Sequence, residues 1–192
     1  MAADQKAANA FVEVKSGGGL IRRRRSSSAH TLPCLVAVAV GLITSLLIPA
    51  EAMAASNKVR ITNLSDVAFG SLANLSVDAV RSQSVCLYAD TNTNGYTITA
   101  MGTGPSGAFQ LTSGLAVMDY EVQWSSSAGQ SSGAQMAPNI PLTGQVSPAT
   151  HQACNNGPPT SASFIVLLRS NALSGAEAGA YNGTLTLVVG PE

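Results

Sequence analysis

Charged side chains are scarce in this chain, and the basic ones are concentrated near its beginning. Lysine, arginine, aspartate and glutamate together make up 10% of the 192 residues. Six of the ten basic residues precede residue 55, so residues 55–192 contain four basic side chains against seven acidic ones. A nucleic-acid interface needs several lysines or arginines that neutralise phosphates. Residues 55–192 lack such a set, and we expect no nucleic-acid role.

Histidine is also rare, which limits the catalytic chemistry available. His151 is the one histidine after residue 55, and the nearby Ser147 and Ser163 lack a G-x-S-x-G motif. His151 lies three residues before Cys154, but nothing in the sequence supplies the other two ligands that zinc needs. We therefore predict no catalytic residue, no cofactor and no metal site, and we expect that the protein is not an enzyme.

Two acidic patterns resemble functional sites, namely a calcium-binding loop and a pair of carboxylates, but each has a simpler structural explanation. Residues 90–95, DTNTNG, match the first half of a calcium-binding loop, but Met101 stands where the bidentate acid belongs. We interpret Asn94-Gly95 as a hairpin turn instead. Asp119 and Glu121 share one face of a predicted strand, and we interpret them as solvated side chains.

An apolar run of fourteen residues, 35–48, follows four arginines at 22–25. A membrane-spanning helix usually needs about 20 apolar residues, so this run is short for one. Small residues follow it and end in A-M-A at 52–54. This layout predicts a secretory signal that is cleaved between Ala54 and Ala55. A retained anchor is the alternative.

The predicted signal divides the chain into two parts. We expect residues 1–54 to be an N-terminal extension plus signal peptide, and residues 55–192 to be one domain with no membrane span once the signal is removed. Cleavage after Ala52 is a second possibility. The stretch before Arg22 is long for such a signal, and translation that begins near Leu20 would explain it.

Only three cysteines are present, and one of them precedes the apolar run. Cys34 should leave with the signal, so Cys86 and Cys154 remain as an even pair in an exported chain. We predict a disulfide between them, with two unpaired core cysteines as the alternative. Closing a loop of 68 residues destabilises the unfolded chain by about 4 kcal/mol at most in the entropy model.

Strands are predicted by apolar residues that alternate with polar ones between turn residues. Residues 118–124 alternate throughout, residues 164–168 are apolar on both faces, and Asn182-Gly183 introduces an alternating run at 184–189. The other predicted elements are strands at 59–61, 67–69, 85–88, 96–100 and 108–111, a short helix within 172–178, and a mobile loop at 125–137. About seven or eight strands predict an all-β, antiparallel sandwich.

The order of these segments carries a family resemblance. The chain reads VRITNLSDVAFGSL, SVCLYAD, GYTITAMGTGPSGAFQL, MDYEVQW, QACNNG and AGAYNGTLTLVVGPE. It resembles the pilin-type domains of bacterial chaperone–usher systems, in the archaic fimbrial group that includes spore-coat-U-like proteins. The resemblance implies an immunoglobulin-like sandwich that lacks its final strand. A periplasmic chaperone supplies that strand first, and the N-terminal extension of the next subunit replaces it.

The resemblance also implies roles for particular residues. Leu185, Leu187 and Val189 match the strand with which such chaperones pair. Val59 and Ile61 are the candidate donor strand, although only about nine residues precede Leu64, where pilins usually have a dozen or more. Many pilins also have a cysteine just after the donor segment, and this chain has none between residue 55 and Cys86. A subunit that accepts a strand without donating one fits both departures.

These observations predict a structural or adhesive subunit of a surface fimbria that is assembled by donor-strand exchange. Its partners would be a periplasmic chaperone, an usher and neighbouring fimbrial subunits. It would pass through the periplasm to the cell surface or the extracellular space. A self-complete secreted or coat protein of similar fold, and a carbohydrate-binding module, are the alternatives.

Overall fold

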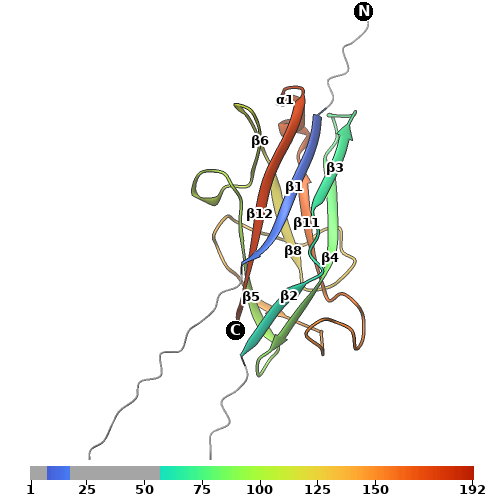
Figure 1. Ribbon diagram of the computed structural model, residues 1–192, viewed down its shortest axis with the longest axis vertical. Coiled ribbons are helices and arrows are strands. Elements are labelled where there is room, and N and C mark those ends of the chain that lie inside the picture. Colours follow the sequence, from blue (N-terminus) through green and yellow to red (C-terminus); the bar gives the residue numbers. More distant parts are fainter. Residues whose placement is uncertain (1–7, 18–56) are drawn as a thin grey trace, which may run out of the picture. The chain divides into compact units, whose positions relative to one another are not determined.

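The computed structural model describes residues 8–17 and 57–192, which form two β-sheets packed on one hydrophobic core (Figure 1). The predicted signal and its cleavage point between Ala54 and Ala55 lie outside the described residues. One sheet has seven strands and the other has five. The predicted all-β class is therefore confirmed as a mostly β, sandwich-like architecture.

The seven-stranded sheet is mixed, so the prediction of an antiparallel sandwich is wrong for this sheet in one pairing. Its main path runs in the order β10 (Leu142–Val146), β5 (Gly95–Met101), β12 (Gly179–Pro191), β1 (Ala8–Gly17) and β3 (Val67–Leu72), while β6 (Gln110–Ser113) pairs with β12 and β7 (Ala116–Asp119) pairs with β6. All of these pairs are antiparallel except β1 with β12, which is parallel. The N-terminal segment thus contributes an interior strand of this sheet.

The five-stranded sheet is antiparallel throughout. Its order is β2 (Lys58–Thr62), β4 (Ala79–Asp90), β11 (Ala162–Leu168), β8 (Glu121–Ser125) and β9 (Ala134–Gln135). All seven residues of β11 are buried, which confirms the strand predicted at 164–168 from its two apolar faces. The α-helix α1 (Ser170–Gly175) follows β11, and a 3-10 helix, η1, spans Pro105–Gly107.

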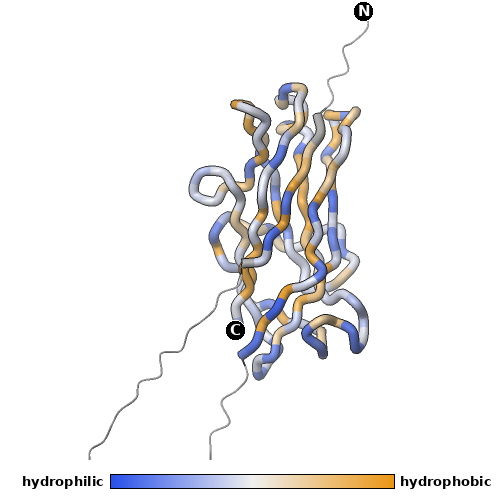
Figure 2. Tube along the Cα trace, viewed as in Figure 1, coloured by the Kyte–Doolittle hydropathy of each residue, from blue (hydrophilic) through white to orange (hydrophobic). Residues whose placement is uncertain are grey.

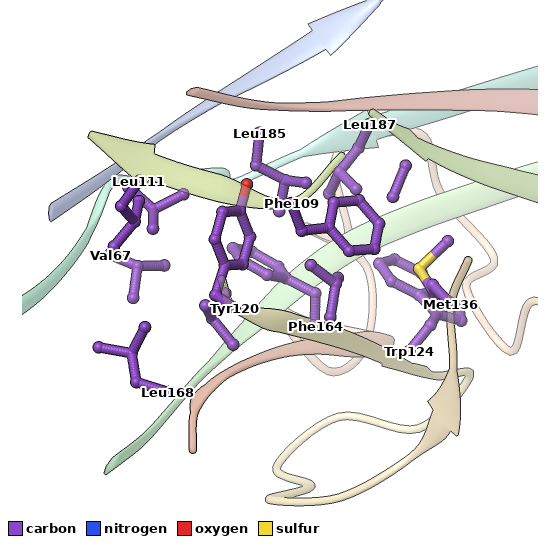
Figure 3. Packing of buried hydrophobic residues seen from close by; sticks show 14 of the residues in the cluster. Val67, Phe109, Leu111, Tyr120, Trp124, Met136, Phe164, Leu168, Leu185 and Leu187 are labelled. Carbon is purple, nitrogen blue, oxygen red and sulfur yellow. The ribbon is translucent and has the colours of Figure 1, made fainter. Parts of the chain in front are cut away.

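The core lies between the two sheets and is filled from both. Figure 3 shows Leu185 and Leu187 of β12 facing Phe164 of β11 and Trp124 of β8. Apolar residues recur along the strands of both sheets, in orange in Figure 2. The indole Nε1–H of Trp124 donates a hydrogen bond of 2.9 Å to the hydroxyl of Tyr96, so the largest buried side chain has its polar atom satisfied.

The strand predicted at 118–124 is wrong in one respect, because the chain leaves one sheet for the other within it. Met118, Tyr120, Val122 and Trp124 are all buried, as their alternation indicates. Residues before Tyr120 belong to β7 in the seven-stranded sheet, and residues after it belong to β8 in the five-stranded sheet. Alternation reports which side faces the core, and both sheets face the same core.

Two Asn-Gly pairs also differ from their predicted roles. A turn does form at Asn94-Gly95, where the Asn94 N–H donates to the carbonyl of Thr91 at 3.2 Å, but it joins β4 to β5 in different sheets and is no hairpin. Asn182-Gly183 lies inside β12. A Cβ on Gly183 would stand 2.8 Å from the carbonyl oxygen of Gln110, so this glycine permits the close approach of β6.

The predicted disulfide is confirmed. Cys86, in the buried centre of β4, is bonded to Cys154 with a Cα–Cα distance of 5.8 Å. The bond fastens the loop between β10 and β11 to the five-stranded sheet.

The loop predicted at 125–137 contains the short strand β9 and is held by several hydrogen bonds. The N–H of Gly129 donates to Ser84 at 2.8 Å, and the buried hydroxyl of Ser163 donates to the carbonyl of Ser127 at 2.9 Å. These hydrogen bonds hold the loop against β4 and β11. The polar composition of the loop had instead predicted a mobile segment.

Candidate strand-acceptor site

The strand β1 enters the seven-stranded sheet between β3 and β12 (Figure 1). It pairs with β12 over its full length, from Ala8 opposite Gly179 to Gly17 opposite Val188. On its other side it pairs with β3, from Ala8 opposite Leu72 to Val12 opposite Val67. We call this position, bounded by β3 and β12, the acceptor site.

The strand β3 depends on β1 for its place in the sheet. Among the described residues, β3 pairs with no strand other than β1. Its remaining polar link to a neighbouring strand is made by a side chain, since the Arg81 guanidinium lies 5.7 Å from the centre of the Phe69 ring and donates to the Phe69 carbonyl at 3.4 Å. Without β1, the facing backbone edges of both β3 and β12 would lack partners.

A bulge in β3 adapts it to β1. The register between the two strands shifts at Ala10 and Phe11, so that Ala10 pairs with Gly70 and Phe11 pairs with Ala68. Gly70 has a φ of +68°, a left-handed backbone conformation that favours glycine. The bulge leaves Phe69 unpaired in the ladder with its side chain buried.

The inward face of β1 closes the hydrophobic core. Ala10 is 3% exposed, Val12 is fully buried, and Val14 packs against the edge of the same cluster. On β12, Leu185 and Leu187 are fully buried in that cluster too. Burying one valine side chain stabilises a fold by about 1.5 to 3 kcal/mol, so this face alone favours the inserted position of β1.

The outward face of β1 is polar apart from Phe11, which is 37% exposed. Glu13 forms an ion pair of 3.0 Å with Lys15 on the same strand and accepts a hydrogen bond from Thr184 of β12 at 3.3 Å. Both charged side chains are about half exposed, and such surface pairs contribute little. Backbone pairing and the two buried side chains therefore hold β1.

The strand β1 runs parallel to β12. A strand joined to its neighbour by a tight hairpin runs antiparallel to it, whereas a parallel neighbour needs a long connection. Here residues 18–178 connect β1 to β12, and residues 18–66 connect it to β3. The structure thus completes the sheet with a strand that is distant in sequence from both of its neighbours.

The residues predicted to pair with a chaperone lie beside the acceptor site. Leu185, Leu187 and Val189 belong to β12, and Leu185 is opposite Val14 of β1 in the ladder. The other edge of β12 pairs with β5. A strand added to β12 from outside would therefore use the edge that β1 occupies, while pairing with a chaperone stays a prediction.

The candidate donor residues lie elsewhere. Val59 and Ile61 belong to β2, which pairs antiparallel with β4 at the edge of the five-stranded sheet. Ile61 is 8% exposed and contributes to the core of its own domain. Donation of these residues to another subunit stays a prediction, and the strand that lies between β3 and β12 is β1.

The groups considered for catalysis are not assembled into a site. The hydroxyl of Ser147 donates to the carbonyl of Leu87 at 2.5 Å, and Ser163 bonds to the loop after β8. His151 accepts a bond from the backbone N–H of Ala153 at 3.3 Å through Nδ1. Each of these polar groups has a structural partner.

The acidic pair is also separated. Asp119 lies in β7 and accepts a hydrogen bond from Gln110 at 2.9 Å, while Glu121 lies in β8 and accepts two bonds from Arg169, at 2.6 and 2.9 Å. Arg169 also contacts Asp78 at 2.9 Å. Hydrogen bonds from Arg169 lower the pKa of Glu121, and the Ser170 N–H and Arg169 lower that of Asp78. This cluster fastens the start of α1 to β8.

No three His, Cys, Asp or Glu side chains within 8–17 and 57–192 are grouped so as to hold a metal ion. No helix in these two ranges is long and apolar enough to cross a membrane.

No protein-family model matches the chain, and no curated protein matches it in sequence.

Sequence reasoning missed the acceptor site because it assigned residues 1–54 to an extension and a signal. The pattern of a strand was present in the sequence, because Val12 and Val14 alternate with Glu13 and Lys15 shortly before Gly17-Gly18-Gly19. That pattern is typical of a half-buried strand followed by a turn or linker. Because this strand pattern precedes the apolar run at 35–48, it was assigned to the N-terminal extension.

Proposed function

We propose that this protein is a structural subunit of a surface fibre, of the pilin type, whose incomplete immunoglobulin-like sandwich is completed by an added strand. The observation that carries the proposal is the attachment of β3 to the rest of its sheet through β1. Residues 57–192 supply the other described strands, so β1 is the one described strand that comes from outside this continuous range.

The chemistry of the acceptor site supports strand addition. Two backbone edges, on β3 and β12, offer hydrogen bonds to an extended segment, and alternate side chains of that segment enter the core. Backbone pairing supplies affinity in this mode of recognition, and the buried side chains supply specificity. An exposed pair of such edges promotes aggregation, which gives a periplasmic chaperone a physical role during export.

The experiment is to express residues 55–192 with and without a candidate chaperone, beside the full chain. The proposal expects residues 55–192 to aggregate alone and to be soluble in a complex. A monomeric domain 55–192 that unfolds at the same temperature as the full chain would contradict it.

A second function is favoured by a specific observation. The acceptor site is filled by residues 8–17 of the same chain, as a self-complete secreted or coat protein requires. Mass spectrometry of the exported protein separates the two functions. A product that begins at Ala55 supports the fibre subunit, and a product that retains residues 8–17 supports the self-complete protein.

A further inference from the structure

We propose that a hollow on the outward face of the seven-stranded sheet binds one pyranose unit of an uncharged oligosaccharide. We call it the outer hollow. Its volume is about 400 Å³, which lies within the range of about 300 to 1,000 Å³ that is typical of small-ligand pockets. The inference goes beyond the proposed function and does not rest on strand exchange. It applies to the chain that retains residues 8–17.

The outer hollow is built by neighbouring strands of one sheet. Asn182 of β12 lies opposite Phe11 of β1 on one side and Thr112 of β6 on the other, and Figure 1 shows these three strands side by side. Because side chains alternate along a strand, Phe11 and Glu13 face outward while Val12 faces the core. The six side chains that line the hollow are Phe11, Glu13, Thr103, Thr112, Asn182 and Thr184.

Phe11 supplies an apolar platform. Its side chain is 37% exposed, and the other outward side chains of β1 are polar. The face of an aromatic ring carries partial negative charge and a large apolar area. A pyranose ring has a face of C–H groups that matches such a surface in shape and polarity. Phe11 is therefore the position on which a sugar ring stacks.

The polar side chains of the hollow match the hydroxyl groups of a sugar. The carboxylate of Glu13 accepts hydrogen bonds, whereas the amide of Asn182 and the threonine hydroxyls both donate and accept them. Asn182 and Thr112 are exposed beside Phe11. Thr184 donates to Glu13 at 3.3 Å and so orients the carboxylate. A ligand with several adjacent hydroxyls can use these groups together.

The charges of the hollow favour an uncharged ligand. Glu13 is the charged residue among its six lining side chains, and the ammonium of Lys15 lies 3.0 Å from that carboxylate. An acidic sugar would meet the carboxylate at close range, and an amino sugar would compete with Lys15 for it. The ligand class is thus a neutral saccharide.

The backbone of the hollow excludes recognition by strand addition. At Asn182 the strand β12 is paired with β1 on one edge and with β6 on the other. An extended peptide needs a free strand edge for its backbone hydrogen bonds. A ligand of the outer hollow is therefore held by side chains.

The test measures binding of the full chain to defined sugars. The uncharged probes are oligosaccharides of glucose, mannose and galactose on a printed panel, and oligosaccharides that contain glucuronic acid or glucosamine are the charged ones. At least one uncharged probe should bind, and it should bind more tightly than the charged probes. Isothermal titration calorimetry then gives the dissociation constant of that probe in solution.

Two substitutions at one position test the stacking platform. Phe11→Leu keeps an apolar side chain without a ring and should weaken binding about tenfold. Phe11→Tyr keeps the ring and should bind within about threefold of the parent. Ile140→Ala removes an apolar side chain that is 60% exposed outside the hollow, and it should leave the dissociation constant unchanged. Thermal unfolding of each variant confirms that it is folded.

Each outcome supports or overturns the inference. Weaker binding by Phe11→Leu together with retained binding by Phe11→Tyr supports it. Failure of every uncharged probe to bind, or binding of charged probes alone, overturns it. Equal binding by Phe11→Leu and the parent would place the sugar elsewhere and overturn it as well. The proposed fibre function is tested separately by the solubility of residues 55–192, so either proposal can fail without the other.

Discussion

Two buried tyrosines in the core differ by one hydrogen bond. Tyr96 is fully buried, and its hydroxyl accepts a bond from Trp124 at 2.9 Å. Tyr120 is 4% exposed, and its buried hydroxyl has no partner among the described residues. A buried hydroxyl without a partner costs about 1 to 3 kcal/mol, so the two positions contribute oppositely to stability.

The same substitution should therefore have opposite effects at the two positions. Tyr96→Phe leaves the indole N–H of Trp124 unpaired and should lower the free energy of unfolding by about 1 to 3 kcal/mol. Tyr120→Phe removes the unpartnered hydroxyl and should raise it by about 1 kcal/mol. Denaturant unfolding of the two variants beside the parent measures both effects. Destabilisation by Tyr120→Phe as large as that by Tyr96→Phe would refute this account of the core.

The same burial predicts a loss of stability at alkaline pH. Burial raises the pKa of Tyr96 from its ordinary value of 10.0 to about 12, despite the opposing effect of the Trp124 bond, and burial also raises the pKa of Tyr120. The folded state thus binds these protons more tightly than the unfolded state. The contribution of Tyr96 is fully present below pH 10 and is lost as the pH rises toward 12.

The measurement is the free energy of unfolding as a function of pH. Tyr96 should account for a fall of roughly 2 to 3 kcal/mol across this range. The fall should be smaller by about that amount in the Tyr96→Phe variant. A stability that is constant up to pH 12 would show that the pKa of Tyr96 is the same in the folded and unfolded states, which would contradict this prediction.

At the scale of elements, the disulfide joins a central strand to a long loop. Replacing Cys86 and Cys154 together by serine should lower the free energy of unfolding by about 2 to 4 kcal/mol, because 68 residues separate the two cysteines. Denaturant unfolding checks the change, and reduction of the parent protein should reproduce it. Equal stability of the oxidised and reduced forms would mean that the bond is dispensable.

The strands show what alternation can and cannot predict. Burial of Met118, Tyr120, Val122 and Trp124 follows from their spacing. The change of sheet at Tyr120 does not follow, because the Tyr120 N–H bonds to the carbonyl of Phe109, a partner chosen by the tertiary fold. The sequence was therefore informative about the facing of strands and uninformative about their neighbours.

The glycines of the two Asn-Gly pairs likewise show what local sequence can and cannot predict. At Asn94-Gly95 local chemistry predicted the turn correctly, but the hairpin was wrong because β4 and β5 belong to different sheets. At Gly183 the reason for glycine is the backbone of β6, which lies too close for a side chain. Local sequence does not report contacts of that kind, and the strand β12 was accordingly predicted to start five residues after its first residue, Gly179.

At the scale of the molecule, a sandwich that lacks a strand was predicted from a family resemblance alone, and it stays a prediction. The structure shows the distant segment β1 between β3 and β12. The disulfide was predicted because two cysteines allow one pairing. The filling of the acceptor site by residues 8–17 was not predicted, because pairing between segments so distant in sequence depends on two strand edges that exist only after folding.

If β1 joins β3 to its sheet, hydrogen exchange of the backbone amides should detect the loss of β1. The full chain is compared with a variant that lacks residues 1–19. Amides of residues 67–72 should lose their protection in the variant, while those of β11, at residues 162–168, exchange slowly in both. Unchanged protection of residues 67–72 in the variant would contradict it.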